Sequence, residues 1–506
     1  MEILPLLGQG FSIALQPEHL LLALFGCFLG TLIGALPGIG PLNGIAVLIP
    51  LAFSLGLSPI GSLILLTSVY YGTMFGGRIS SILLNIPGDA PAVMTCLDGY
   101  PMARQGLAAE ALAISAISSF VGGTLATLGL TLCAPLLAKS AIYFGPAEYF
   151  ALFVLAMVSV GGVGSANPVK TLLAGLVGLA ISTVGIDPAS GVPRYTFDNY
   201  ELFDGIDFAV AAIGLFALSE FFLFLERPGG PPGGAIQVGS LRGYRRLIFP
   251  LPTLRASLLG FVIGVLPGAG ATMASFLGYT MEKKIAGTEG RFGHGDPRGV
   301  AAPEAADNAA AGGNLVPMLT LGIPGSGTTA IMLGMLVSLN IQPGPLLFER
   351  QPDVVWGLVA ALYISNVMLL VLNIPLVGLF ARLMLVPPKY LMPLVVVISF
   401  MGVYTINNST FDLLLMSAFG VLGYLLRKMD FALVPVVLGM LLGGQMEQNL
   451  RRALGASGGE WGILFSSPLA VGLHLCSFAL IAVSLALQLR RRFQGQDATP
   501  AAVTRG

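Results

Sequence analysis

The residues best suited to chemistry in this chain are small polar side chains beside Pro-Gly breaks in long apolar runs. Four such breaks occur, at Pro37–Gly44, Pro87–Pro91, Pro267–Gly270 and Pro324–Gly327. Hydroxyls, amides and free backbone N–H groups suit carboxylate oxygens, and the same groups with carbonyls suit a sodium ion. In lipid, a broken helix leaves backbone groups unpaired at several kcal/mol each, so breaks persist only inside protein or a polar cavity. We therefore predict that the breaks line a binding site.

The predicted site combines backbone atoms of the breaks with the polar side chains next to them. From the first half of the chain it takes Pro37, Gly38, Gly40, Asn43, Asn85, Pro87, Gly88 and Asp89. From the second half it takes Pro267, Gly268, Gly270, Thr272, Asn308, Asn314, Pro324, Gly325, Ser326, Thr328 and Thr329. A single Pro-Gly pair is more often a kink or a packing site, but four breaks at matching positions favour a site for an anion and a cation. No catalytic residues and no dedicated metal site are expected, although Na⁺ could bind at the same loops.

Two charged residues near the second break have open roles. A membrane-embedded acid is a candidate site residue, so Asp89 is weighed equally as a ligand and as a solvated loop residue. Arg78 could reach a carboxylate bidentately, but an interfacial or structural role is favoured over a ligand role.

Composition places the chain in a membrane. It has 506 residues, of which 55% are hydrophobic and 10% are charged, and its mean hydropathy is +0.85. A soluble domain carries about 25% charged residues, which excludes a water-soluble globule. Apolar runs near the roughly 20 residues that cross a bilayer recur from end to end, without the alternation of a β-barrel. We predict an all-α polytopic membrane protein with about twelve to fourteen membrane segments, some too short or too broken to span alone. No nucleic-acid partner and no cofactor are expected.

The chain repeats itself at long range. The stretch from Gly30, "GTLIGALPGIGPLNGIAVL", is matched by "GFVIGVLPGAGATMASFLG" from Gly260, 230 positions later. The triplet Ile86-Pro87-Gly88 recurs as Ile323-Pro324-Gly325, 237 positions later. Two ordered matches with nearly equal offsets indicate two homologous halves, with a period too long for a solenoid.

The predicted organisation follows from the repeat and the distribution of charge. We expect a first transmembrane repeat (1–225), a Pro/Gly/Arg linker (226–255), a second repeat (256–450), a connecting loop with an extra C-terminal helix (451–490) and a tail (491–506). Arginines in the linker and the tail place both in the cytoplasm, and the acidic N-terminus outside. Such halves would be inverted repeats, with broken helices and re-entrant Pro-Gly loops.

At these motifs the chain resembles the large membrane subunit of the tripartite tricarboxylate transporters, the TctA-type family. The matching stretches run from about Gly30 to Leu454 and include "GALPGIGPLNGIAVLIPLAF", "GGRISSILLNIPGDAPAVMTCLDGYPMARQG", "GVLPGAGATMASFLGYTMEKK" and "PEAADNAAAGGNLVPMLTLGIPGSGTTAIMLG". The resemblance implies a multi-pass protein of the bacterial inner membrane. Its partners would be a small membrane subunit (TctB-type) and a periplasmic solute-binding protein (TctC-type). One departure leaves a role open, because Asp307 stands where the family usually shows a second asparagine.

The functional hypothesis is secondary active uptake of di- or tricarboxylates such as citrate, by alternating access. Moving an anion inward against about 100 mV costs about 2.3 kcal/mol per charge, so accumulation requires a coupled Na⁺ or H⁺. The alternatives are a passive anion channel and, with less support, an intramembrane enzyme. An enzyme would need a nucleophile–base pair or metal ligands, and Ser326 has no obvious base. The residues do not decide which carboxylate is carried, nor Na⁺ against H⁺.

Overall fold

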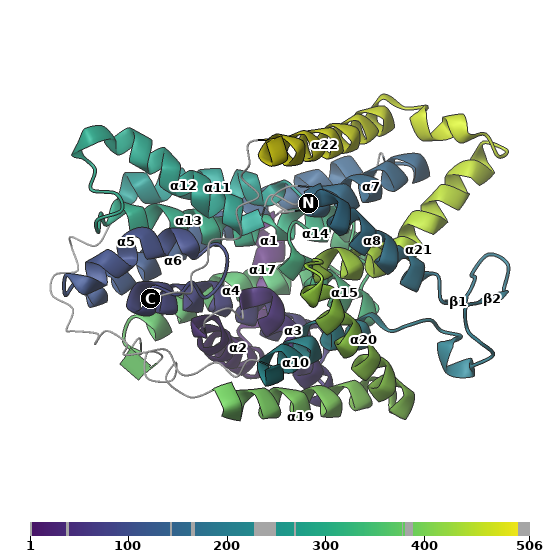
Figure 1. Ribbon diagram of the computed structural model, residues 1–506, viewed down its shortest axis with the longest axis horizontal. Coiled ribbons are helices and arrows are strands. Elements are labelled where there is room, and N and C mark those ends of the chain that lie inside the picture. The colour runs from purple at the N-terminus through teal and green to yellow at the C-terminus, as the bar shows by residue number, and fades with distance from the viewer. Residues whose placement is uncertain are drawn as a thin grey trace. The chain divides into compact units, whose positions relative to one another are not determined.

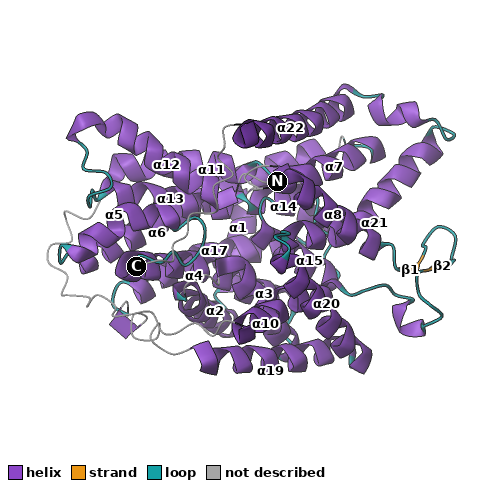
Figure 2. Cartoon of the chain, viewed as in Figure 1, coloured by secondary structure: helices purple, strands orange, loops and turns teal. Residues whose placement is uncertain are grey.

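Helices make up most of the described part of the chain. The computed structural model describes residues 3–36, 40–141, 144–162, 167–226, 249–267, 270–376, 378–379 and 388–493. Within these ranges the strands are confined to one two-residue antiparallel pair, β1 (Gly185–Ile186) and β2 (Pro193–Arg194) (Figures 1 and 2). The predicted all-α fold is confirmed.

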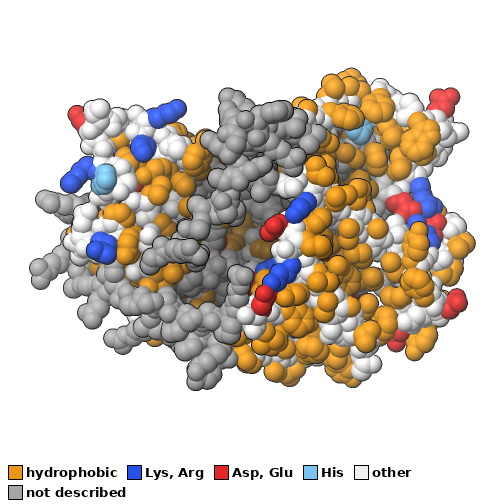
Figure 3. All heavy atoms as spheres, in the orientation of Figure 1, with side chains coloured by type: hydrophobic (Ala, Val, Ile, Leu, Met, Phe, Trp, Pro, Cys, Tyr) orange, Lys and Arg blue, Asp and Glu red, His pale blue; other side chains and the backbone are white. Residues whose placement is uncertain are grey.

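Six of the described helices are long and apolar enough to cross a membrane. They are Pro17–Ala35, Pro59–Leu84, Ala108–Lys139, Phe208–Glu226, Pro352–Asn373 and Thr410–Lys428. Eight shorter apolar helices accompany them: Ile3–Ala14, Gly40–Ser54, Pro146–Ser159, Pro168–Ser182, Pro250–Val265, Gly327–Ser338, Met392–Thr405 and Pro468–Ser484. On the face in Figure 3, hydrophobic side chains cover much of the described surface and charged ones form small groups. These features identify a multi-pass membrane protein.

The chain forms two compact units, and each takes segments from both predicted halves. Unit 1 consists of 1–142 with 207–425, and unit 2 of 143–206 with 426–506.

Unit 1 begins with the helices α1 (Ile3–Ala14), α2 (Pro17–Ala35), α3 (Gly40–Ser54), α4 (Pro59–Leu84), α5 (Val93–Arg104) and α6 (Ala108–Ala141). It continues with α9 (Phe208–Ile213), the π-helical turn η2 (Gly214–Leu218), α10 (Ser219–Glu226), α11 (Pro250–Val265), α12 (Gly270–Ala286) and η4 (Gly287–Glu289). It ends with α13 (Arg298–Gly313), α14 (Leu315–Leu321), α15 (Gly327–Ser338), α16 (Leu347–Arg350), α17 (Pro352–Asn373), α19 (Pro388–Asn407) and most of α20 (Thr410–Lys428).

Unit 2 holds α7 (Pro146–Gly162), α8 (Pro168–Ser182), the β1–β2 hairpin, η1 (Tyr200–Leu202), α21 (Leu433–Ala456), η5 (Trp461–Phe465) and α22 (Pro468–Phe493). Helix α21 packs on α7 and α8, and α22 packs on α7. Helix α22 covers the range of the predicted extra C-terminal helix, and its crossing of the membrane stays a prediction. Helix α21 extends through Arg451 to Ala456, so the predicted connecting loop begins later than expected.

Glycines let the helices of unit 1 approach closely. Helix α2 packs on α4 through Gly30, where an added Cβ would lie 2.4 Å from the carbonyl oxygen of Val69. Helix α11 packs on α13 in the same manner, with an added Cβ on Gly260 only 2.2 Å from the carbonyl oxygen of Ala306. Such separations exclude any side chain, as in other membrane helices that pack through small residues.

These close contacts recur between the halves at the offsets of the sequence repeat. Gly34 faces the Thr73 carbonyl oxygen as Gly264 faces that of Ala310. The two glycines are 230 positions apart in the sequence, and their two partners are 237 positions apart. These are the offsets of the two sequence matches. The duplicated sequence therefore builds the same local packing twice. That the halves lie inverted in the membrane stays a prediction.

The breaks are also alike in the two halves. Helices α2 and α11 both end with a bond from a leucine N–H, Leu36 or Leu266, to the carbonyl oxygen three residues earlier. The next helices start at Gly40 and Gly270, with φ of +64° and +63°. These left-handed values favour glycine.

The structure corrects the extent of the first break. Helix α3 already begins at Gly40, so Asn43 and Gly44 lie in its first turns and not in a loop. Pro41 at the first helical turn is compatible with a helix, because its missing N–H has no partner to lose there. Pro37, Gly38 and Gly268 lie outside the described residues. Helix α11 begins at Pro250, within the range predicted as linker; most of that linker lies outside the described residues.

Candidate functional site

In the first half, the loop after α4 packs against the place where glycines of α2 and α4 meet. A Cβ built on Gly88 would come within 2.5 Å of the Gly77 Cα and 2.6 Å of the Gly34 carbonyl oxygen. The next residue, Asp89, lies beside the start of α3, where a Cβ on Gly40 would be 3.4 Å from the Asp89 Cβ. The start of α3 and the loop after α4 therefore lie next to each other; that the four breaks share one site stays a prediction.

In the second half, the loop before α15 packs on the junction of α13 and α14. A Cβ on Gly325 would lie 2.7 Å from Oδ1 of Asn314, the counterpart of the Gly88–Gly77 contact. Ser326 caps α15: its hydroxyl accepts from the Thr329 N–H, and its own N–H donates to the Thr329 hydroxyl at 2.9 Å. The hydroxyls of Ser326 and Thr329 therefore hold the helix start, and Thr328 is buried in its first turn.

Helix α13 carries a polar stripe among its alanines. Glu304, Asp307 and Asn314 are spaced by three and seven residues, which places them on one helical face. They are 2%, 4% and 0% exposed. Asn308 is also buried, but its amide donates to the Glu304 carbonyl oxygen at 3.0 Å and so serves the helix itself.

Glu304 and Arg78 are joined through one hydroxyl. Nη1 of Arg78 donates to Oγ of Ser119 at 3.2 Å, and Ser119 donates to Oε2 of Glu304 at 3.1 Å. The Thr95 hydroxyl donates to Oε1 of Glu304, and the Phe75 ring lies 4.5 Å from the guanidinium carbon. Arg78 is 1% exposed, so the interfacial alternative for it is wrong, and the buried acid and base offset each other.

Around this pair, buried polar atoms are left without partners among the described residues. They include Oδ2 of Asp89, Oδ1 of Asp307, Oγ of Ser115, and both Oδ1 and Nδ2 of Asn314. The other oxygen of Asp89 accepts from the Ala92 N–H at 3.0 Å. Because Oδ2 of Asp89 is buried, a solvated loop does not describe this residue. An unpaired buried polar group costs about 1–3 kcal/mol, so such a cluster is a candidate place for a polar ligand to bind.

Other predicted site residues lie apart from this cluster or serve the backbone. Asn85 is exposed and ends α4 in the left-handed conformation, as Gly322 ends α14. Thr272 is exposed, and Gly270 has no atom within 4 Å of an added Cβ. Pro87, Pro267 and Asn43 are half-buried, and Pro324 is buried.

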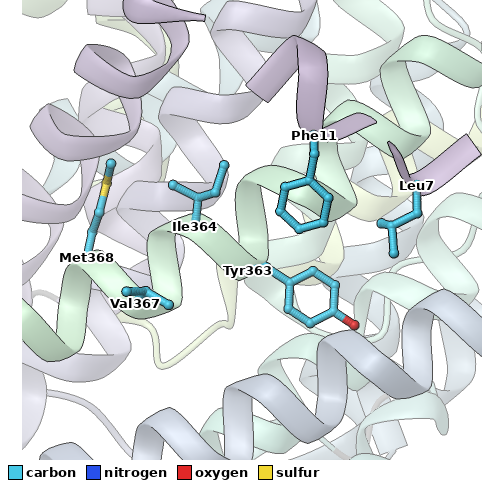
Figure 4. Close-up of a pocket in the computed structure, with 6 residues that line it drawn as sticks. All are labelled: Leu7, Phe11, Tyr363, Ile364, Val367 and Met368. Carbon is cyan, nitrogen blue, oxygen red and sulfur yellow. The ribbon is translucent and has the colours of Figure 1, made fainter. Parts of the chain in front are cut away.

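A pocket of about 530 Å³ lies elsewhere, between α1 and α17 (Figure 4). It is lined by Leu7, Phe11, Tyr363, Ile364, Val367 and Met368. These side chains supply one hydroxyl and no charge. The pocket therefore does not suit a carboxylate.

The sequence prediction missed the partners that surround Glu304. Thr95 and Ser119 come from α5 and α6 and carry no local signal. Glu304 itself had a signal, because "PEAADN" places two acids three residues apart in a helix of small residues. Among the described residues, no group of three or more His, Cys, Asp or Glu side chains could hold a metal ion.

Comparison with known proteins identifies the family. The family model described as "Tripartite tricarboxylate transporter TctA family" matches residues 20–438. The chain is 39% identical over 496 residues to "Uncharacterized 52.8 kDa protein in TAR-I ttuC' 3'region" of Agrobacterium vitis, covering 97% of this chain and 98% of that protein. It is 40% identical over 228 residues to "Uncharacterized protein in TAR-II ttuC' 3'region" of the same organism, covering 45% of this chain and 93% of that protein. No solved structure matches.

A match over most of the chain confirms the resemblance seen in the motifs. A component of a tricarboxylate transporter is the role that this membership implies, which makes an enzyme a poor alternative. The protein belongs to the tripartite tricarboxylate transporter TctA family.

Proposed function

We propose that the protein is the transport subunit of a system that imports di- or tricarboxylates by secondary active transport. A separate periplasmic binding protein would deliver the substrate, a small membrane subunit would assist, and a Na⁺ or H⁺ gradient across the bacterial inner membrane would drive uptake. The observation that carries this proposal is the group of unpartnered buried polar atoms beside the Pro-Gly loops, in a chain of this family.

The chemistry of the loops suits a carboxylate. The buried amide of Asn314 offers N–H donors and an acceptor oxygen, and the Tyr70 hydroxyl lies near it and near Ser326. The loops also carry backbone N–H groups, and such groups bind anions without carrying a charge of their own.

A coupled cation follows from the charge of the cargo. Against about 100 mV, negative inside, a trivalent anion faces roughly three times the 2.3 kcal/mol of a single charge. Buried acids at the loops would repel such an anion unless a cation accompanied it. Alternating access between the two duplicated halves would then carry both together.

The test is uptake of radiolabelled citrate into proteoliposomes that contain the protein with both partner proteins. Na⁺ and pH gradients are imposed separately, and other di- and tricarboxylates are scanned as competitors. We expect accumulation above the external concentration, dependent on the binding protein and on one of the gradients. Absence of uptake for every carboxylate under both gradients would contradict the proposal.

A passive anion channel is distinguished in the same vesicles. Ionophores that collapse both gradients should abolish accumulation by a coupled transporter. A channel would continue to equilibrate the substrate at an unchanged initial rate.

A further inference from the structure

We propose that Asp89 and Asp307 together form the binding site of the coupling ion, and that this ion is a proton. The inference rests on the proposed function and names the ion and the residues that carry it. Its starting observation is geometric: two buried carboxylates from different elements each keep an oxygen that no described residue satisfies.

The two carboxylates belong to one electrostatic site. Asp307 lies on the buried stripe of α13, and Asp89 lies in the loop that packs on Gly77 of α4. A Cβ on Gly77 would lie 3.4 Å from Oδ1 of Asp89, and α4, which carries Gly77, packs on α13, which carries Asp307. Two neighbouring carboxylates in a buried site cannot both keep a negative charge at low cost.

The other charged groups near Asp307 do not neutralise the pair. Helix α4 supplies Arg78, which is linked through Ser119 to Glu304, the acid on α13 itself. One positive charge therefore faces three acids. Among them, Glu304 is the acid that a single bridging hydroxyl, that of Ser119, connects to Arg78.

The other basic residues on the elements packed on α13 are exposed or already paired; the exposed ones are Arg104 of α5, Lys139 of α6, and Lys283 and Lys284 of α12. Helix α6 presents Ser115 and Ser119, which are neutral. Arg255 of α11 is engaged with Glu282 of α12 through two hydrogen bonds of 2.8 and 2.9 Å. Asp98 of α5 is held by four donors. One added positive charge would balance one of the two remaining carboxylates.

A proton fits the donor set better than a metal cation does. Hard metal cations such as Ca²⁺ gather about six or more oxygen ligands. The unpartnered buried carboxylate oxygens here are those of Asp89 and Asp307, and among the described residues no group of three or more His, Cys, Asp or Glu side chains could hold a metal ion. A proton needs only one carboxylate oxygen, and binding it there removes the repulsion from the other acid.

The proposed cycle uses one proton and no other chemistry. In the outward-open state the pair takes up a proton from the outer solution, which removes one negative charge before the substrate anion enters. After the change of access, the substrate leaves, the pair releases the proton to the cytoplasm, and both carboxylates return to the starting state with the free site open outward. With one proton per substrate and no membrane potential across the vesicles, each unit of pH difference raises the steady-state accumulation ratio about tenfold.

The test is citrate accumulation in the reconstituted three-component vesicles with either a pH gradient or a Na⁺ gradient. For the wild type, we expect the tenfold gain per pH unit, and no gain from Na⁺ at equal pH. Asp307→Asn and, separately, Asp89→Asn should lose that gain, because an amide cannot take up the proton. Asp198→Asn, at an exposed carboxylate of unit 2, is the matched control and should keep it.

A second measurement does not depend on transport. Infrared difference spectra of the wild type with isotope-labelled aspartate should show a protonated carboxyl band that disappears as the pH is raised, and Asp307→Asn should lack the titrating band. This measurement still applies if a variant folds poorly, since the wild type alone must show the titration.

The outcomes separate the two proposals. Wild-type uptake with the pH-driven gain intact in both variants, or a gain from Na⁺ alone, would overturn the proton site and leave carboxylate transport standing. No titrating band in the wild type would also overturn it. Absence of wild-type uptake contradicts the proposed function, while a band that titrates and disappears in Asp307→Asn would still support the proton site.

Discussion

Gly88 lies directly against Gly77, so that the loop after α4 folds back onto the helix that precedes it. A Cβ on Gly88 would stand 2.5 Å from the Gly77 Cα and 2.9 Å from its carbonyl oxygen. Both obstacles are backbone atoms, which cannot rotate away. The loop reaches the site only because neither position carries a side chain.

Valine at Gly88 or at Gly325 should therefore abolish carboxylate uptake. The added side chain would push the loop away from Gly77 in one case and from Asn314 in the other, which displaces the polar groups of the site. Membrane insertion should persist, because the apolar helices are unchanged. Uptake in whole cells, with the protein quantified in isolated membranes, measures both properties.

The control is Gly472→Val in α22, where an added Cβ meets nothing within 4 Å. It should transport at the wild-type rate. Near-normal uptake by Gly88→Val or Gly325→Val would remove these loops from the mechanism.

The close helix packing could be predicted from sequence because its signal is local. Glycines four residues apart, such as Gly30 and Gly34, and their copies 230 positions later mark the faces that meet. The positions of the breaks follow from Pro and Gly in the same way. The residue at which the first break ends could not be predicted in this way. Glycine followed by proline also suits the first turn of a helix, and Gly40 and Pro41 form such a turn.

The charge pairing at the site could not be predicted, because it depends on contacts between distant segments. Thr95, Ser119 and Glu304 come from three helices, and no spacing in the sequence relates them. The grouping into two units was missed for the same reason. Segments from both sequence halves pack together in each unit, whereas the repeat pattern shows only which segments resemble one another.

Ser119→Ala should destabilise the protein by about 1–3 kcal/mol, because it leaves Nη1 of Arg78 and Oε2 of Glu304 each without a buried partner. The measurement is the free energy of unfolding in detergent. Ser118→Ala is the matched control, since its hydroxyl has only a 3.5 Å contact with Thr253. Equal effects of the two substitutions would show that the bridge contributes nothing.

Asp98→Ala should cost at least about 3 kcal/mol, since hydrogen bonds to a charged group contribute about 1.5–3 kcal/mol each. Oδ1 of Asp98 accepts from the N–H groups of Gly293, Gly295 and Asp296 at 2.8–2.9 Å. These bonds hold the segment that leads into α13, so citrate uptake should fall together with stability.

Tyr279→Phe is the graded comparison for Asp98→Ala. It removes only the 2.9 Å bond from the tyrosine hydroxyl to Oδ2 of Asp98. Its cost should be less than half as large, as measured by the same unfolding titration. A tyrosine effect as large as that of Asp98→Ala would contradict the dominant role of the three backbone donors.

The hairpin of unit 2 should loosen only in strong acid. The Ser190 hydroxyl, the Ala189 N–H and the Arg451 guanidinium lower the pKa of Asp187 to about 2. Because this pKa is depressed from about 3.9 in an unfolded chain, the stabilisation is complete above that value and is lost as the pH falls through about 2. Arg194 and Arg451 lower the pKa of Glu447 in the same network.

Hydrogen exchange of the Ala189 amide, corrected for its intrinsic rate, should therefore accelerate between about pH 4 and pH 2. Asp187→Asn should remove that dependence, whereas Asp204→Asn, at an exposed position in the same region, should retain it. Acceleration already at neutral pH would show that the carboxylate does not hold the hairpin.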